Sequence, residues 1–224
     1  MNDFDHRRQG PDRAAALAQY RRRAGVYDLE LALFEPIRRQ AIARLALQRG
    51  DTVLDVGCGT GLSLALLREG VGARGRIIGI EQSPEMIEKA RERVVQNRWR
   101  NVTLLCSPVE AVDIPGRANA ALFHFTHDIL RRPAAIDNVV RCLVPKARVV
   151  ACGLKWARAW AAPANLLVLP AALRSMTSLE GLHEPWSRLA ERTGPLEVET
   201  MLLGAVYIAS GRLAGKSAHG LDDR

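Results

Sequence analysis

The chain has 224 residues, of which 48% are apolar. That is enough to bury the core of one α/β domain, and it excludes an intrinsically disordered chain. The 32 basic and 24 acidic residues give a net charge of +8, which favours anionic partners such as phospholipid surfaces, nucleic acids or acidic substrates. The four cysteines form no C-x-x-C pair, so the sequence predicts no metal site and no redox motif.

The sequence contains no signal for membrane insertion or export. Residues 1–12 are polar and lack an apolar signal core. The longest uncharged stretch, residues 159–173, is shorter than the ~20 residues that span a bilayer, and it contains Pro163 and Pro170. We therefore predict no transmembrane segment and a cytoplasmic location.

Helix and strand signals alternate between two polar tails. In chain order the predicted elements are a helix at 36–48, a strand at 52–56, a helix at 62–69, a strand at 76–81, a helix at 84–96 capped by Ser83, strands at 102–106 and 120–125, a helix at 133–143, a strand at 147–152, a helix at 185–192, and strands at 196–203 and 205–210. The last two flank Gly204, which is the spacing of an antiparallel hairpin. The alternation predicts an α/β three-layer sandwich with a seven-stranded, mostly parallel sheet that ends in this hairpin.

Three glycines at alternate positions follow the first predicted strand. They are Gly57, Gly59 and Gly61 in the stretch VLDVGCGTG at residues 53–61. Glycines allow a tight turn and a close approach to a ligand, and the helix that follows directs its N-terminal N–H groups at an anionic group. The next strand ends in Glu81, whose carboxylate can accept hydrogen bonds from both hydroxyls of a ribose. The spacing predicts a nucleoside-bearing ligand at the carboxyl ends of these strands.

The glycine spacing distinguishes between nucleoside cofactors. A nicotinamide fingerprint of the form G-x-G-x-x-G would place its third glycine at position 62, where the chain has Leu62. This mismatch and the terminal hairpin both disfavour a NAD-dependent reductase.

Two segments carry a family resemblance. VLDVGCGTG at 53–61 and IIGIEQSPEMIEKARER at 77–93 resemble the motifs of Rossmann-like (class I) methyltransferases that depend on S-adenosylmethionine (SAM), above all the small-molecule and lipid-type branch. The resemblance covers roughly residues 20–210. It implies SAM as cofactor, S-adenosylhomocysteine (SAH) as product, and one domain over 1–212, with a helical cap at 1–50, an insertion or lid at 153–185 and a polar tail at 213–224.

The resemblance also implies which residues contact SAM. For the methionine part and the ribose it implies Asp55, Gly57, Cys58, Gly59, Gly61 and Glu81. For the adenine, for closure over SAM and for backbone contact after the fourth strand it implies Gln82, Met86, Pro108, Val109, Glu110, Tyr27 and His124. Pro108 stands near the place where many members have an acid that binds the adenine amine, so that contact falls to backbone groups or to Glu110. This departure, with Asn119 before the fourth strand and Lys146 after Pro145, indicates a divergent branch.

Candidate catalytic residues lie in the segment FHFTHD at 123–128, directly after the fourth strand. Transfer of a methyl group from a sulfonium requires in-line positioning and exclusion of water. It needs a general base only when the acceptor carries a proton that must leave. His127 and Asp128 are the candidates for that role, and His124 is a further one. The alternative reading is that His124 ends the strand and Asp128 caps the next turn.

Residues 154–186 hold three tryptophans, Trp156, Trp160 and Trp186, among few charges. They predict either an additional core helix or an apolar lid over a hydrophobic acceptor. We therefore predict a small or lipid-like acceptor and leave peripheral contact with anionic lipid open. Two alternatives remain. One is a nucleic-acid methyltransferase, suggested by the charge but lacking the Asn-Pro-Pro-aromatic motif after the fourth strand, and the other is a SAM-binding protein without catalytic activity.

Overall fold

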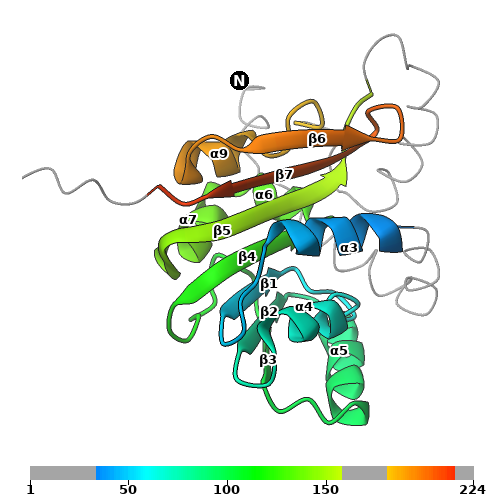
Figure 1. The fold of residues 1–224 in the computed structure, drawn as a ribbon, viewed down its shortest axis with the longest axis vertical. Helices are drawn as coiled ribbons and strands as arrows, with labels where there is room; N and C mark the ends of the chain where they lie inside the picture. Colours follow the sequence, from blue (N-terminus) through cyan, green and yellow to red (C-terminus); the bar gives the residue numbers. More distant parts are fainter. Residues whose placement is uncertain (1–33, 158–180, 215–224) are drawn as a thin grey trace, which may run out of the picture.

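The computed structural model describes residues 34–157 and 181–214, and Figure 1 shows their arrangement. The predicted helical cap at 1–50 is described only from residue 34, and the predicted insertion at 153–185 only at its two ends. Tyr27 and residues 158–180 therefore lie outside the described part of the chain. No helix among the described residues combines the length and the apolar character needed to cross a membrane.

Seven strands form a single sheet in the order β3-β2-β1-β4-β5-β7-β6. Their bounds are β1 Thr52–Val56, β2 Arg76–Glu81, β3 Val102–Cys106, β4 Ala118–His124, β5 Leu143–Leu154, β6 Glu197–Met201 and β7 Val206–Arg212. The pairs from β3 to β5 are parallel, and β7 runs antiparallel to both β5 and β6. This is the predicted sheet, mostly parallel and closed by an antiparallel hairpin.

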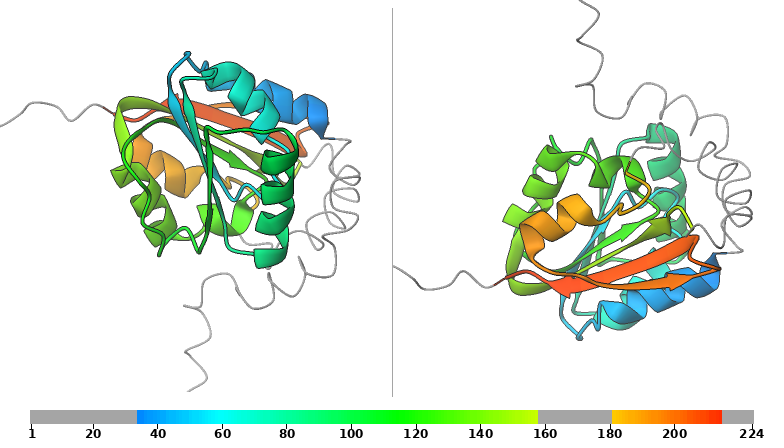
Figure 2. Two further views of the ribbon diagram at one scale, coloured as in Figure 1. Left: turned by 90° about the horizontal axis from the view of Figure 1, so that it is seen from below. Right: turned by 90° about the horizontal axis from the view of Figure 1, so that it is seen from above.

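Helices cover both faces of the sheet, as the two views in Figure 2 show. One face carries α3 (Glu35–Arg44), α4 (Leu64–Val71) and α5 (Pro84–Gln96), and the other carries α6 (His127–Leu130), α7 (Pro133–Arg141) and α9 (Ser187–Thr193). The result is the predicted three-layer sandwich.

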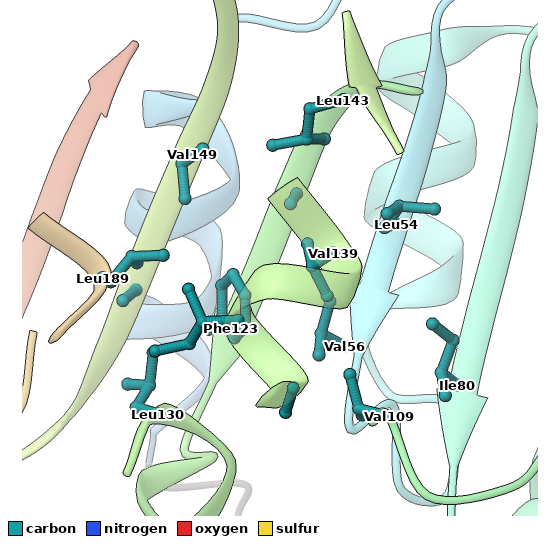
Figure 3. Packing of buried hydrophobic residues seen from close by; sticks show 14 of the residues in the cluster. Leu54, Val56, Ile80, Val109, Phe123, Leu130, Val139, Leu143, Val149 and Leu189 are labelled. Carbon is teal, nitrogen blue, oxygen red and sulfur yellow. The ribbon is translucent and has the colours of Figure 1, made fainter. Parts of the chain in front are cut away.

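The central strands are buried on both faces, so successive side chains enter two separate cores. Figure 3 shows one of them, in which Val56 and Phe123 pack against Val139 of α7. Val53 and Leu122 belong to the other core, beneath α3 and α4. By the same alternation, Asp55 and His124 are placed on the α3 side of the sheet.

The strand order reverses between β1 and β4, which lie side by side with Val56 paired to Phe123. Such a switch point leaves a crevice at the carboxyl ends of the strands, where ligands of parallel sheets bind. The loop after β1 and the loop after β4 meet there.

The observed elements differ from the predicted ones by a few residues at several ends, and three differences concern β4, β5 and the helices between them. The helix at 133–143 ends at Arg141, because β5 already begins at Leu143 and pairs with Ala118 across a register shift. β4 starts two residues earlier than predicted and ends at His124 rather than at residue 125. The short helix α6 was not predicted, since four residues carry too little periodicity to reveal a helix.

Candidate functional site

A cleft with two adjoining lobes opens at the carboxyl ends of β1, β2 and β4. The first lobe encloses about 770 Å³, part of it open to solvent, and the described residues that line it are Gly57, Gly59, Ile80, Glu81, Gln82, Met86, Val109, Glu110, His124, Phe125, Thr126, His127, Asp128, Ile129 and Arg132. The second encloses about 340 Å³ between Arg38, Asp55, Gly57, Cys58, Gly59, Thr60, Leu62, Ser63, His124 and Phe125. Four described residues line both lobes, namely Gly57, Gly59, His124 and Phe125.

The glycine loop is tied to the neighbouring strand. The backbone N–H groups of Gly57 and Cys58 both donate to the carbonyl oxygen of Ile80, at 2.8 and 3.0 Å. Gly57 has a φ of +73°, and a Cβ added to it would lie 2.5 Å from Cγ2 of Thr126 in the loop after β4. Only glycine allows these two loops to approach so closely.

Glu81 at the end of β2 is buried, with 8% of its surface exposed. One carboxylate oxygen accepts from the backbone N–H of Ser83 at 2.8 Å and the other from that of Gly59 at 3.1 Å. Burial raises the pKa of Glu81, and these backbone N–H groups oppose the rise. Each carboxylate oxygen keeps a second lone pair, so the group can also accept from two hydroxyls of a ligand.

The second lobe places a buried cation and a buried carboxyl group together. Arg38 of α3 is 2% exposed and Asp55 of β1 is 1% exposed. Nη1 of Arg38 donates to Glu35, whereas no described residue bonds its Nε and Nη2 or the Oδ2 of Asp55. Burial raises the pKa of Asp55 to about 7, although the positive charge of Arg38 opposes it. Buried polar groups are normally hydrogen-bonded, so this arrangement indicates a ligand with both a negative and a positive group.

Sequence reasoning did not single out Arg38, although the pattern around it carried the signal. Arg38 precedes Ala41, Ile42 and Leu45 by three, four and seven residues, so it shares their helix face. All three are buried. An arginine on an otherwise apolar helix face is rare enough to mark a candidate ligand contact.

A loop at residues 108–112 forms another wall of the first lobe through Val109 and Glu110. Asn138 of α7 holds this loop from behind, because its side-chain amide donates to the carbonyl oxygens of Val109 at 2.7 Å and Val112 at 2.9 Å. Arg132 donates to Glu110 at 2.6 Å. Neither Asn138 nor Arg132 was predicted from the sequence.

The segment after β4 carries two unusual features. Phe125 has a φ of +56°, a left-handed conformation that is a true outlier for a bulky residue. The centroid of its ring lies 5.0 Å from that of the Phe34 ring and 4.9 Å from that of the His124 ring. Burial, aided by the positive charge of Arg38, lowers the pKa of His124 to about 3. His124 therefore carries a neutral imidazole at neutral pH, and within the described part of the chain its Nε2 has no hydrogen-bond partner.

His127 and Asp128 both line the first lobe. They lie in the first turn of α6, whose N-cap residue is Thr126 and not Asp128. Of the alternative reading, the structure bears on one point: His124 ends β4.

The cleft brings together most of the residues predicted to contact SAM: Asp55, Gly57, Cys58, Gly59, Glu81, Gln82, Met86, Val109, Glu110 and His124. Pro108 and Gly61 line neither lobe. A Cβ on Gly61 would lie 2.7 Å from Leu64 and 3.2 Å from Ala90, so the third glycine serves the packing of the loop against α4 and α5. Tyr27 lies outside the described residues.

Comparison with known proteins finds similarity to methyltransferases. Residues 53–146 match a family model described as a methyltransferase domain. The chain is 33% identical over 119 residues to the aklanonic acid methyltransferase DauC of Streptomyces sp. (strain C5), a match that covers 53% of this chain and 54% of that protein. Other curated relatives are named arsenite methyltransferase, protein-L-isoaspartate O-methyltransferase and 23S rRNA methyltransferase. The chain spans about half the length, or less, of these four relatives.

Solved structures share the fold. A SAM-dependent methyltransferase from Aquifex aeolicus superposes with a TM-score of 0.64 at 21% identity, covering 85% of this chain and 98% of that one. The N-methyltransferase NodS of Bradyrhizobium japonicum WM9, in complex with SAH, gives a TM-score of 0.57 at 18% identity over 80% of this chain and 87% of its own. Taken together, these findings show that residues 53–146 are a methyltransferase domain and that the described residues have the fold of Rossmann-like (class I) SAM-dependent methyltransferases.

Proposed function

We propose that the chain transfers the methyl group of SAM to a small or lipid-like acceptor by in-line displacement. The observation that carries this proposal is the presence of buried Arg38 and Asp55 in the lining of one lobe and of Glu81 in the lining of the other. SAM has an α-carboxylate and an α-ammonium at one end and a ribose at the other. The unpartnered guanidinium nitrogens suit the α-carboxylate, Oδ2 of Asp55 suits the ammonium, and Glu81 suits the ribose hydroxyls.

The adenine fits the first lobe in this assignment. Gln82, which follows β2, and Met86 in the first turn of α5 flank it on one side, and Val109 and Glu110 flank it from the 108–112 loop. The Asn138 side chain keeps that loop in position. Gly61 and Pro108 take no direct part, and Cys58 contributes through its position in the glycine loop.

When bound, SAM supplies a methyl group that its sulfonium already activates. The chain has to hold the acceptor in line with that group, exclude water and, for a protic acceptor, receive a proton. We propose that His127 and Asp128 orient the acceptor or take this proton, since both line the first lobe. Proton transfer by such a group contributes roughly 10²- to 10⁴-fold.

The domain layout supports an acceptor site near the end of β5. The backbone N–H of Trp156 donates to the carbonyl oxygen of Leu182 at 2.9 Å, and Leu182 is fully buried. The predicted insertion at 153–185 therefore leaves and rejoins the domain at one point beside the carboxyl edge of the sheet. We propose a single domain over 1–212 with an insertion at 153–185.

The small-acceptor assignment rests on the relative DauC, named for aklanonic acid, and on a first lobe whose lining combines the apolar Phe125 and Ile129 with the polar His127 and Asp128. A labelling experiment tests this acceptor class. A cell lysate is separated into metabolite, lipid, protein and RNA fractions, and each fraction is incubated with the chain and with SAM that carries a label in its methyl group. We expect label in the metabolite or lipid fraction, with the product identified by mass, and none with the Arg38→Met variant.

Each other result has a definite meaning. Label in RNA or protein contradicts the acceptor class. SAM binding without label in any fraction indicates a SAM-binding protein without catalytic activity. Absence of SAM binding in calorimetry contradicts the assigned ligand contacts.

A further inference from the structure

The two lobes meet at four residues, and only two of these have side chains beyond Cα. Gly57, Gly59, His124 and Phe125 line both lobes. If the lobes hold the two ends of SAM, as proposed above, the sulfonium that joins those ends lies where the lobes meet. The side chains nearest to it are then those of His124 and Phe125.

The backbone fixes Phe125 in a conformation that such residues avoid. Its φ is +56°, and its N–H donates to the carbonyl oxygen of Cys152 in β5 at 2.8 Å. Strained residues of this kind persist only where the surroundings hold them, and they concentrate at functional sites. The rings of Phe34 and His124 flank the Phe125 ring, so its place is fixed on two sides.

The electrostatics at this point suit a cation. The face of a phenylalanine ring attracts a ligand cation, most strongly in a desolvated site. The lowered pKa of His124 keeps its imidazole uncharged, so it does not repel a positive sulfonium. Arg38, the described cation of the second lobe, suits the α-carboxylate at the far end of the ligand.

We propose that Phe125, beside His124, forms an aromatic wall for the sulfonium and thereby raises the affinity of the site for SAM relative to SAH. This inference rests on the proposed function. During transfer the bond between sulfur and the methyl carbon breaks, its electron pair stays on sulfur, and the methyl carbon bonds to the acceptor. Sulfur then carries no charge, the attraction to the ring disappears, and the product SAH is held less tightly.

Titration calorimetry with SAM and SAH tests this without knowledge of the acceptor. Phe125→Leu should weaken SAM binding by about five- to tenfold, since a desolvated cation–π contact accounts for a difference of that order. SAH binding should change by less than about twofold. Phe34→Leu is the matched control, because Phe34 belongs to the same ring stack but lines neither lobe; its SAM-to-SAH affinity ratio should equal that of the wild type.

Two further sets of variants keep the test decisive if Phe125→Leu does not fold. Pentafluorophenylalanine incorporated at position 125 preserves the shape of the ring and removes its negative face, so it should lower the SAM-to-SAH affinity ratio in the same way. His124→Arg adds a charge and should lower the ratio, whereas His124→Gln should leave it unchanged. Equal weakening of SAM and SAH by the position-125 variants would overturn the inference. Failure of the wild type to bind either ligand would instead overturn the proposed function.

Discussion

The side-chain amide of Asn138 in α7 donates a 2.7 Å hydrogen bond to the carbonyl oxygen of Val109, whose side chain lines the first lobe. A second bond, to Val112, uses the other amide hydrogen. Asn138 is only 7% exposed, so water cannot easily replace it. The position of the 108–112 loop, proposed above to flank the adenine, therefore depends on a residue that does not line the cleft.

Asn138→Ala should destabilise the protein and weaken SAM binding together. Loss of the amide leaves two carbonyl groups without donors, at a cost of about 1–3 kcal/mol each. Chemical denaturation measures the loss in the free energy of unfolding, and calorimetry should show SAM affinity reduced several-fold. Asn138→Asp, which cannot donate in its ionised form, should behave similarly. Unchanged SAM affinity in a destabilised Asn138→Ala variant would show that the loop does not contact the adenine.

Arg38→Met should abolish recognition of the amino-acid end of SAM. A charged hydrogen bond contributes about 1.5–3 kcal/mol, so SAM affinity should fall by roughly 10- to 100-fold. Adenosine lacks that end, and its affinity should not change. Arg39→Met is the control, because Arg39 pairs with the same Glu35 but is exposed. A parallel loss of adenosine affinity in the Arg38 variant would indicate a structural role instead.

The stability of the unliganded protein should depend on pH through Asp55. Burial raises its pKa from 3.8 to about 7, so between these values the folded state binds more protons than the unfolded state. The contribution of Asp55 to the free energy of unfolding is therefore most favourable below pH 3.8, falls as pH rises towards 7 and is constant above it. The total loss is roughly 2–4 kcal/mol. Denaturation of the wild type and of Asp55→Asn from pH 4 to 8 measures this effect. The difference between their free energies of unfolding should fall as pH rises, and a difference that does not vary with pH would contradict the prediction.

His127→Ala should lower turnover by roughly tenfold or more, while SAM affinity stays within about twofold. The reason is that His127 lines the first lobe and is proposed to act on the acceptor and not on SAM. Steady-state kinetics with the acceptor found in the labelling experiment, together with SAM calorimetry, measure both quantities. Wild-type turnover in the variant would remove His127 from the mechanism.

Gly57→Ala should destabilise the protein more than Gly116→Ala. Both glycines have a positive φ, but a Cβ at Gly57 would meet Cγ2 of Thr126 at 2.5 Å, whereas one at Gly116 would meet nothing within 4 Å. The clash adds about 1–3 kcal/mol to the conformational cost that both variants share. Equal losses in the free energy of unfolding would mean that the loops after β1 and β4 separate easily.

Most of the fold could be predicted from local patterns. The strands β1, β2 and β3 have the predicted bounds, and Ser83 caps α5 as expected by accepting from the N–H of Met86 at 3.3 Å. Short buried strands and Pro- or Ser-initiated helices carry strong local signals. β5 was predicted too short because its first residues, including Pro145 and Lys146, lack the apolar pattern of its buried half.

The site could be predicted only where its residues belong to a contiguous motif. The glycine loop and Glu81 do, and the cleft contains them. Arg38, Asn138 and Phe125 do not, because their roles arise from distant contacts. Arg38 lines the same lobe as Asp55 because α3 packs on the sheet, and Asn138 of α7 donates to Val109 in a different part of the sequence. The left-handed conformation of Phe125 has no signature in sequence at all.

In the proposed binding mode, the contacts with SAM come from two different parts of the chain. The segment that matches the methyltransferase domain begins at residue 53, after α3 has ended at Arg44. The proposed contacts with the nucleoside therefore lie inside the matched segment, whereas the proposed contact of Arg38 with the amino-acid moiety comes from a helix that precedes it. Exchange of α3 is thus expected to change the binding of SAM analogues modified at the amino-acid end and to leave the binding of the nucleoside unchanged.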